Sequence, residues 1–502
     1  MKQESLWQSG SHASFPSLTR KLSVEVLIIG GGITGVTAAY LLKKAGKKVA
    51  LVERKQIVSG ETGHTTAHVT YPTDTRLTKL IKTFGKDHAQ AAWDAQSAAA
   101  DQINAAATEE RIKCELRHVP GFLYAAHETP VEKEAPHLVE DFQAAADMGF
   151  DVSYVQSAPV VERPAIRFAN QLKLHPRKYL EGLAHCIAGN DCHVYENSEV
   201  TEFGEDSKSV VCNGHQIFYE WVFVATHVPL QGKTGTTSAM MFQTKLSLYS
   251  SYVLGATLPP GTLPEALWWD TSDPYTYLRV DRHQGHDYVI IGGEDHKTGQ
   301  ETDTEGCYFR LEQKLHRLLP SAKVDRRWSG QVIETNDGLP FIGETEEAQY
   351  VAAGYSGTGI TWGTVAAMMF RDHVLGVANP WADLLSVNRK PLSKTWDYLK
   401  ENKDYPYYLV KGLLTGAGSD VEQLKPGEGK LMRCSGKKVA AYRQEDGTLR
   451  LLSPVCPHLG CTVAWNNAEK SWDCPCHGSR FSATGELIGG PAETSLEPVK
   501  SN

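Results

Sequence analysis

Cysteine and histidine occur together in two short segments near the C-terminus, at spacings that suit metal coordination. The first segment contains Cys456 and His458, the second contains Cys474 and His477, and 15 residues separate His458 from Cys474. Two thiolates can bind one iron of a [2Fe–2S] cluster while two imidazoles bind the other iron. Zinc sites usually use hooks of two cysteines, whereas each of these segments pairs one cysteine with one histidine. We therefore predict that these four residues bind a [2Fe–2S] cluster, with a zinc site as the alternative.

Three glycines near the N-terminus, Gly30, Gly32 and Gly35, follow an apolar run of buried-strand type at the spacing G-x-G-x-x-G. Such glycines allow a sharp turn, a close approach of backbone to a pyrophosphate, and close packing of the next helix on the strand. The N-terminus of that helix favours an anion. A second strand, at residues 48–52, leads to Glu53, which is placed to accept a hydrogen bond from a ribose 2′-OH. This unit predicts a dinucleotide site; an ordinary strand-to-helix turn is the alternative.

Further segments have the pattern of elements that would complete such a site. Residues 350–363 run from an apolar strand through small residues into a helix that begins near Thr358, which gives a second helix start suited to an anion. Residues 59–70 are small and hydroxylated and could place backbone against a cofactor, or they form an ordinary polar loop. Two more strands are expected in the dinucleotide domain, at residues 194–200 and 221–226. Propensity and periodicity also predict helices at residues 87–110, 131–148 and 175–186.

Length, composition and charge restrict the class of protein. A chain of 502 residues exceeds one hydrophobic core and indicates two or three domains. The formal net charge is −8 and the sequence has no basic cluster, so we expect no nucleic-acid partner. Residues 1–22 lack the features of a secretion signal, and no window approaches the roughly 20 apolar residues of a membrane span. We therefore expect a soluble, cytoplasmic protein.

The motifs GGGITG, ATHVP, DGLP and AGYSGTGIT resemble those of FAD-dependent oxidoreductases of the D-amino-acid oxidase and sarcosine oxidase family, over about residues 24–376. The resemblance implies an α/β FAD-binding domain of the Rossmann-like, glutathione-reductase type, joined to an antiparallel-sheet substrate domain. It implies that FAD is bound by Gly30, Gly32, Ile33, Thr34, Gly35, Glu53, Arg54, Thr62, His64, Thr65, Thr66, Val200, Ala225, Gly354, Ser356, Gly357, Thr358, Gly359 and Ile360. In some amine dehydrogenases of this family a similarly placed histidine binds the flavin covalently. His64 is the candidate here, with a simple hydrogen bond as the alternative.

Residues 419–502 resemble Rieske iron–sulfur domains, which are all-β, and especially the type found in cytochrome bc complexes. That type implies a disulfide between Cys461 and Cys476, one from each cluster loop. It also implies that Ser479 donates to a cluster sulfur. A tyrosine of that type is replaced by Phe481 in this chain, so one donor is missing and a lower reduction potential is expected.

The two resemblances together predict a domain plan. The expected parts are an N-terminal strap at 1–22, the FAD-dependent oxidoreductase at 23–376, a packed connector at 377–418 and the Rieske domain at 419–502. Within the second part, FAD-binding segments are expected at about 23–80, 170–235 and 325–376. The substrate domain is expected mainly at 110–165 and 240–320, where alternating apolar and polar runs indicate an antiparallel sheet.

A flavin accepts two electrons at once and the cluster carries one, so the fusion predicts a dehydrogenase with its own electron outlet. The resemblance implies oxidation of an amine or amino acid at the C–N bond, with electrons passed to an external one-electron acceptor, either a protein or a small molecule. Candidate residues for a substrate carboxylate are Arg279, Arg326 and Arg327; each could instead be a structural cation. The alternatives are a non-catalytic redox adaptor or sensor, and an FAD oxidase that produces hydrogen peroxide and has an auxiliary cluster. A Rieske oxygenase would need a second iron site, for which the sequence has no convincing motif.

In sarcosine-oxidase-like members a lysine on a strand of the substrate domain promotes the reaction with dioxygen. The matching position here is Ile290, on the expected strand at residues 288–293. Lys245 is the alternative source of a cation. The resemblance therefore implies slow reoxidation by air.

Overall fold

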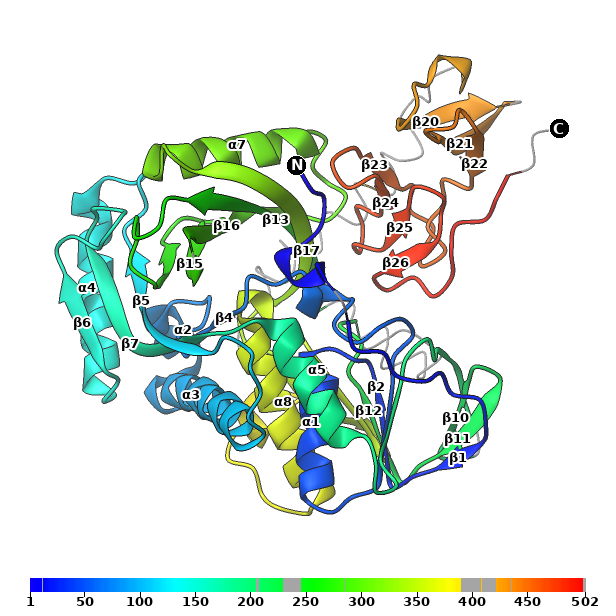
Figure 1. The fold of residues 1–502 in the computed structure, drawn as a ribbon, viewed down its shortest axis with the longest axis horizontal. Coiled ribbons are helices and arrows are strands. Elements are labelled where there is room, and N and C mark those ends of the chain that lie inside the picture. Colours follow the sequence, from blue (N-terminus) through cyan, green and yellow to red (C-terminus); the bar gives the residue numbers. More distant parts are fainter. Residues whose placement is uncertain are drawn as a thin grey trace.

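The structure of the chain, a computed structural model, describes residues 1–10, 12–204, 207–228, 245–283, 285–389, 408, 421–434 and 436–499. Figure 1 shows a parallel sheet flanked by helices, a large curved sheet with a helix across it, and a small β domain that contains the C-terminus. The connector expected at 377–418 lies largely outside the described residues. Its described part contains the short helix α9 (Ala382–Leu385).

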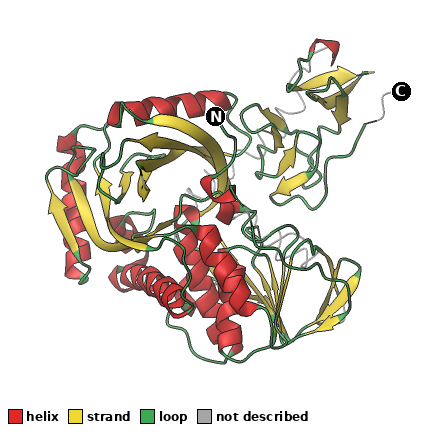
Figure 2. Ribbon diagram, viewed as in Figure 1, coloured by secondary structure: helices red, strands yellow, loops and turns green. Residues whose placement is uncertain are grey.

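The parallel sheet has six strands in the order β18-β19-β12-β2-β3-β8, and only β18 is antiparallel to its neighbour. The strands are β2 (Val26–Ile29), β3 (Val49–Val52), β8 (His193–Tyr195), β12 (Trp221–Val224), β18 (Phe341–Glu346) and β19 (Gln349–Ala353). Both faces are covered, which explains why these strands are continuous apolar runs. Figure 2 shows helices on one side and strands of a smaller sheet on the other.

Three helices pack together on one face of the parallel sheet: α1 (Ile33–Lys44), α5 (Pro176–Ile187) and α8 (Gly359–Val374). Helix α1 begins directly after the glycine turn and buries its first ten residues. It ends with Lys43 and Lys44, whose charges suit the C-terminal end of a helix. The helices α2 (Leu77–Phe84), α3 (Lys86–Glu109) and α4 (Val131–Asp147) lie beyond them. The three helices predicted from the sequence are thus confirmed to within about one residue at each end.

The prediction of one strand at residues 194–200 is wrong, because the structure has two separate strands there. Strand β8 ends at Tyr195, and the chain then turns through Asn197, whose φ of 47° interrupts an extended conformation. Buried Glu196 fixes this turn by accepting the backbone N–H groups of Phe15 and Ile57. The chain continues in a separate four-stranded sheet, in the order β1-β11-β10-β9. Its strands are β1 (Leu22–Ser23), β9 (Val200–Phe203), β10 (Ser209–Cys212) and β11 (His215–Phe218).

The curved sheet follows the order β17-β13-β16-β15-β14-β5-β7-β4, with β6 beside β7. Its strands are β4 (His68–Val69), β5 (Arg117–Tyr124), β6 (Val152–Val155), β7 (Ala165–Lys173), β13 (Leu246–Leu258), β14 (Leu267–Asp270), β15 (Tyr277–His283), β16 (His286–Lys297) and β17 (Lys323–Thr335). Helix α7 (Thr304–Leu318) interrupts the strands expected at 240–320. It packs Cys307, Leu311 and Leu315 against one face of the sheet. The opposite, concave face is therefore left for the site.

The C-terminal domain consists of two small antiparallel sheets, β20-β21-β22 and β23-β24-β25-β26. The strands are β20 (Gly429–Cys434), β21 (Lys437–Arg443), β22 (Leu449–Leu452), β23 (Ala464–Asn466), β24 (Ser471–Asp473), β25 (Arg480–Ser482) and β26 (Leu487–Gly489). Both cysteine–histidine segments lie in loops beside the second sheet. Within the described part of the chain, no helix combines the length and apolar character that a bilayer crossing needs.

Candidate active site and metal centre

A cavity of about 1830 Å³ lies between the parallel sheet and the curved sheet. Its walls include the starts of α1 and α8, the ends of β3 and β12, the loop at 58–66, and residues of β13, β16 and β17. Of the residues expected to bind FAD, those that line it are Gly30, Gly32, Ile33, Thr34, Glu53, Arg54, Thr62, His64, Thr65, Thr66, Val200, Ala225, Gly354, Ser356, Gly357, Thr358, Gly359 and Ile360. Gly35 lies beneath them, where an added Cβ would be 1.9 Å from the Gly30 carbonyl oxygen. The folding of the chain thus brings four distant segments to one cavity.

The nucleotide end of this cavity fits a dinucleotide. Gly30 has a φ of 114°, and a Cβ there would lie 2.4 Å from the Ala225 carbonyl oxygen, so only glycine allows this turn. Neither α1 nor α8 has a capping side chain at its N-cap position, and both helix starts face the cavity. Such helix ends offer N–H groups and positive dipole ends to an anion. Glu53 accepts the backbone N–H groups of Gly31 at 2.7 Å and Lys55 at 2.9 Å, which orients its carboxylate at the cavity wall.

The N-terminal strap holds the cavity loop that contains His64. Ser5 Oγ donates to the Gly63 carbonyl oxygen, and Trp7 Nε1 donates to the Thr65 carbonyl oxygen, each at 2.5 Å. Trp7 is itself buried against the sheet. The His64 ring lines the cavity with its Nδ1 3.0 Å from the Gly60 carbonyl oxygen. Covalent attachment through His64 stays a prediction.

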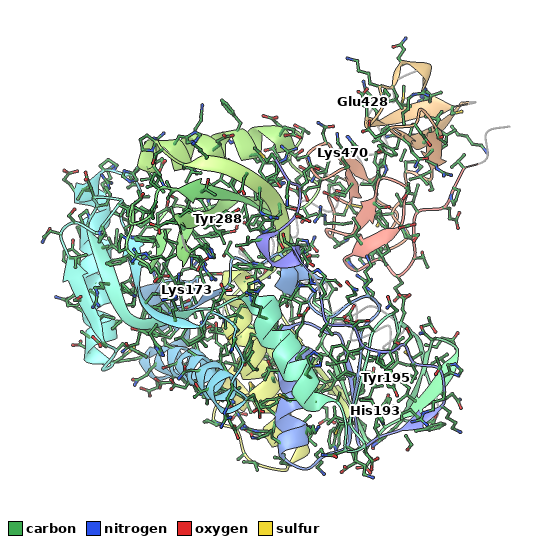
Figure 3. All side chains as sticks on the ribbon, viewed as in Figure 1. Lys173, His193, Tyr195, Tyr288, Glu428 and Lys470 are labelled. Atoms are coloured by element: carbon green, nitrogen blue, oxygen red, sulfur yellow. A yellow bond between two sulfur atoms is a disulfide. The ribbon has the colours of Figure 1, made fainter. Side chains whose placement is uncertain are left out.

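The three arginines considered for a substrate carboxylate are engaged elsewhere, which corrects that expectation. Arg279 is buried, pairs with Asp281 at 2.9 Å, and donates to the Thr66 and Ala67 carbonyl oxygens. The same Asp281 pairs with buried Lys173, which Figure 3 labels. The other two arginines pair with acids outside the cavity, Arg326 with Glu4 and Arg327 with Glu305. None of these three arginines belongs to the described lining of the cavity. An alternating pattern cannot distinguish a cation that binds substrate from one that neutralises a neighbouring acid.

The structure also shows the surroundings of Ile290 and Lys245, the two positions considered for a cation beside the flavin. Ile290 is fully buried in an apolar cluster with Ala67, Val253 and Tyr288. Tyr288 is labelled in Figure 3. The Lys245 ammonium lies against the Val387 carbonyl oxygen at 3.3 Å, and Lys245 is outside the described cavity lining. Neither position therefore presents a positive charge to the cavity.

The four predicted cluster ligands converge in the C-terminal domain. The rings of His458 and His477 are 4.9 Å apart between centroids, and the thiols of Cys456 and Cys474 are buried. Burial lowers the pKa of both histidines to about 4, so the imidazoles are neutral, as metal coordination requires. The Nδ1 atom of His458 is buried without a hydrogen-bond partner among the described residues. An iron ion would supply that partner, so the donor set fits a [2Fe–2S] cluster.

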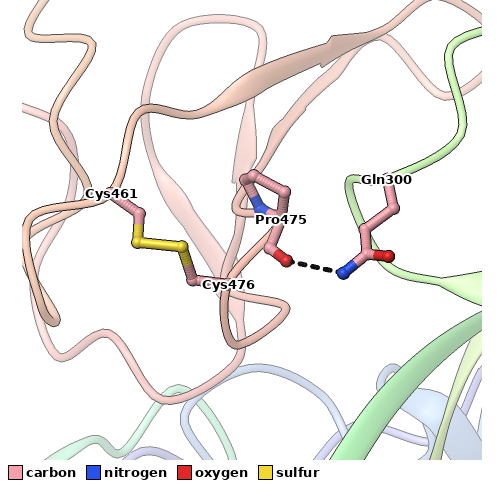
Figure 4. The surroundings of a disulfide bond; sticks show 4 residues. All are labelled: Gln300, Cys461, Pro475 and Cys476. Carbon is pink, nitrogen blue, oxygen red and sulfur yellow. Dashed lines mark hydrogen bonds between the residues drawn. A yellow bond between two sulfur atoms is a disulfide. The ribbon is translucent and has the colours of Figure 1, made fainter. Parts of the chain in front are cut away.

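The disulfide beside the cluster site matches what the resemblance implied, and the role of Ser479 toward a cluster sulfur stays a prediction. Cys461 and Cys476 form a disulfide, shown in Figure 4, and its sulfurs lie within 4.8 Å of the Cys474 sulfur. Ser479 is buried and its hydroxyl oxygen accepts the Ala492 N–H at 3.0 Å. Phe481 is completely buried in the same core. It cannot supply the hydroxyl that a tyrosine would.

The second cluster loop lies against the edge of the flavin cavity. The Gln331 side-chain amide donates to the Gly478 carbonyl oxygen at 2.9 Å, and Gln331 also lines the cavity. The Gln300 amide donates to the Pro475 carbonyl oxygen at 3.0 Å, as Figure 4 shows. On either side of this contact, further bonds join the domains: Tyr308 and Ser329 donate to Glu469 at 2.8 and 2.6 Å, and Arg54 donates to the Ile488 carbonyl oxygen at 2.5 Å. Residues 487–490 and 492–494 also line the cavity. The Rieske domain is thus part of the cavity wall.

Several residues of the site could not be identified from the sequence. They are Asp74, Ser251, Tyr275, Tyr277, Asp295 and Gln331, all of which line the cavity. Ser251, Tyr277, Asp295 and Gln331 lie on strands, and their only signal is strand alternation, which indicates a shared face without indicating what that face contacts. Asp74 and Tyr275 lie in loops, where the sequence gives no such signal.

Fold and site together define a flavoprotein oxidoreductase that carries its own iron–sulfur domain. The family model of FAD-dependent oxidoreductases (DAO) matches residues 25–373, and the chain belongs to this family. The Rieske [2Fe–2S] domain model matches residues 418–500. The predicted fold class and both predicted cofactors, FAD and the [2Fe–2S] cluster, are confirmed by these matches.

Known proteins share either the whole architecture or its flavin part. Over 99% of its length the chain is 33% identical to YhfW of Bacillus subtilis (strain 168), whose name describes a Rieske 2Fe-2S iron-sulfur protein, and it covers 97% of that protein. It is 23% identical to gamma-glutamylputrescine oxidoreductase of Escherichia coli (strain K12), over 74% of this chain and 88% of the relative. The crystal structure of glycine oxidase from Geobacillus kaustophilus matches with a TM-score of 0.59 and 20% identity, over 74% of this chain and all of the other. This last likeness concerns the fold alone.

Proposed function

We propose that the protein is a dehydrogenase that oxidises an amine or amino acid at a C–N bond and passes the electrons through its own Rieske cluster to an external one-electron acceptor. FAD supplies a two-electron acceptor in such a reaction, and the cluster supplies a one-electron carrier. The substrate loses two electrons and two protons to become an imine, which water hydrolyses to a carbonyl compound and an amine. Two equivalents of acceptor then take up the two electrons.

The contact between Gln331 and Gly478 carries this proposal. Gly478 directly follows the cluster ligand His477, and Gln331 is part of the cavity wall. Its side chain also reaches Thr298 Oγ1 at 3.1 Å, so two bonds fix the amide between the cavity and the cluster loop. An auxiliary cluster with another purpose would not need to lie at this wall. The apolar side chain at position 290, where a lysine would promote the reaction with dioxygen, also supports slow reoxidation by air.

An anaerobic screen of amines and amino acids, followed by flavin absorbance, tests the proposal. We expect at least one compound to bleach the flavin, and a one-electron acceptor such as ferricenium to restore its absorbance far faster than air. Hydrogen peroxide formed in equal amount to the product, at the full turnover rate, would instead identify an oxidase. Failure of every amine and amino acid to bleach the flavin would favour a redox adaptor.

A further inference from the structure

The concave wall of the cavity is acidic and rich in tyrosine. Asp295 and Ser251 project into it from β16 and β13, and Tyr277 lies 2.8 Å from Ser251 through its hydroxyl oxygen. In the same cavity, Asp74 accepts the N–H of Gly357 and, at 3.2 Å, the hydroxyl of Tyr275, whose ring lies 5.7 Å from that of Tyr277. Carboxylates and the electron-rich faces of aromatic rings are the groups that hold organic cations.

One of these carboxylates, that of Asp295, has an oxygen without a hydrogen-bond partner among the described residues. This oxygen is Oδ1, and it is buried. Burial of this carboxylate raises the pKa of Asp295 to about 7, since the group loses water without gaining a cation. An unpaired buried carboxylate in a cavity wall is costly unless a ligand completes it.

The nearby cations of the chain already have partners. On α7, Arg310 and Lys314 pair with Glu294 at 2.6 and 3.0 Å rather than with Asp295. Arg76 lines the cavity and pairs with Asp141 at 2.6 Å and with Glu134 through its Nε and Nη1 atoms, while its Nη2 atom is buried without a hydrogen-bond partner among the described residues. The remaining described lysines and arginine of the lining are Arg54 and Lys55 beside Glu53, and Lys79 and Lys82 at exposed positions of α2. None of these described cations forms an ion pair with Asp295.

We propose that the substrate carries a second ammonium group, held by Asp295 and the neighbouring tyrosines, and is a diamine or polyamine rather than an α-amino acid. The nitrogen that is oxidised needs a free lone pair, and a carboxylate beside it would keep it protonated. The acid is therefore suited to the distal nitrogen of the substrate, which stays charged. This inference rests on the proposed amine chemistry and deepens it.

Calorimetric binding of putrescine to the FAD-loaded protein, without turnover, tests the inference. Butylamine has the same carbon chain and one charge, and glycine and proline represent amino acids. We expect putrescine to bind more tightly than butylamine, and Asp295→Asn to remove about tenfold to a hundredfold of that affinity, as for a hydrogen bond to a charged group. Asp270→Asn is the matched control. Asp270 lines the same cavity, but its Oδ1 already accepts the N–H groups of Ser272 and Thr276, and asparagine keeps that acceptor.

Equal binding of putrescine and butylamine, absence of putrescine binding, or equal losses in Asp295→Asn and Asp270→Asn would each overturn the inference. If glycine or proline bleaches the flavin and binds more tightly than putrescine, the proposed dehydrogenase stands and the diamine assignment fails. If putrescine binds through Asp295 but no amine bleaches the flavin, the site stands and the proposed chemistry fails.

Discussion

Replacing Gly299 by alanine should separate the cluster loop from the flavin cavity. Gly299 follows β16, has a φ of 79°, and faces the Rieske domain. A Cβ at this position would lie 2.8 Å from the Pro475 nitrogen, 2.9 Å from the Cys474 carbonyl carbon and 3.0 Å from the Asp473 carbonyl oxygen. All three are backbone atoms, so no side-chain rotation can relieve the contact. The cluster loop must move away from the β16 end.

The free-energy cost of Gly299→Ala has two separate parts, one from the backbone conformation and one from the steric contact. The left-handed conformation disfavours any residue with a Cβ by about 1–2 kcal/mol. Forcing an extra methyl group against fixed backbone adds about 1–3 kcal/mol. Gly261→Ala is a matched control, because Gly261 has a φ of 75° and nothing lies within 4 Å of its added Cβ. The second cost alone corresponds to about a 5- to 150-fold change in the population of the docked arrangement.

Flash photoreduction of the bound flavin, followed by the absorbance of the cluster, measures the consequence without a known substrate. Electron transfer to the cluster should slow in Gly299→Ala in proportion to the lost docked population, and should keep its normal rate in Gly261→Ala. The FAD content and the cluster content of both variants should be unchanged. Normal electron transfer in Gly299→Ala, with the variant folded and loaded, would refute the role of this contact.

Three further predictions concern the cofactors and the acidic wall. Cys474→Ser should abolish the cluster and leave FAD bound, because the two sites lie in separate cores, and iron and acid-labile sulfide analysis together with flavin absorbance will measure this. Trp7→Phe should weaken FAD retention by up to about tenfold, because it removes a hydrogen bond to the Thr65 carbonyl that contributes about 0.5–1.5 kcal/mol; fluorescence of released flavin measures it. Burial raises the pKa of Asp295 to about 7, so its carboxylate becomes charged only as the pH rises through that value. Putrescine affinity measured by calorimetry should therefore rise from about pH 6 to about pH 8, and Asp295→Asn should remove the rise.

Local patterns predicted the two cofactors because the residues of each diagnostic motif are close in sequence. The spacing of Cys456, His458, Cys474 and His477 lies within two loops of one small domain, so few folds could separate these residues. The glycines of the first turn are likewise demanded by local geometry, because an added Cβ at Gly35 would lie 1.9 Å from the Gly30 carbonyl oxygen. Motif spacing of this kind predicts a cofactor without knowledge of the tertiary structure.

The remaining features depend on contacts between distant segments. Gln331 and Gly478 are 147 positions apart, and nothing in either segment indicates that they meet. Arg279 lies on an expected strand, but its pairing with Asp281 and with the loop carbonyls became evident only from the packing. The split between β8 and β9 falls in the polar run 196–199, and it depends on a distant contact, because buried Glu196 accepts the backbone N–H groups of Phe15 and Ile57.

Direct electron transfer between the two cofactors of one chain is the central claim, and its dependence on protein concentration tests it most directly. After flash photoreduction of the flavin under anaerobic conditions, the cluster of the unaltered protein should be reduced in a first-order process. The rate constant of that process should stay the same when the protein is diluted about tenfold, because donor and acceptor lie in one molecule. A rate that falls in proportion to concentration, or a cluster that stays oxidised while the flavin is reduced, would contradict the account.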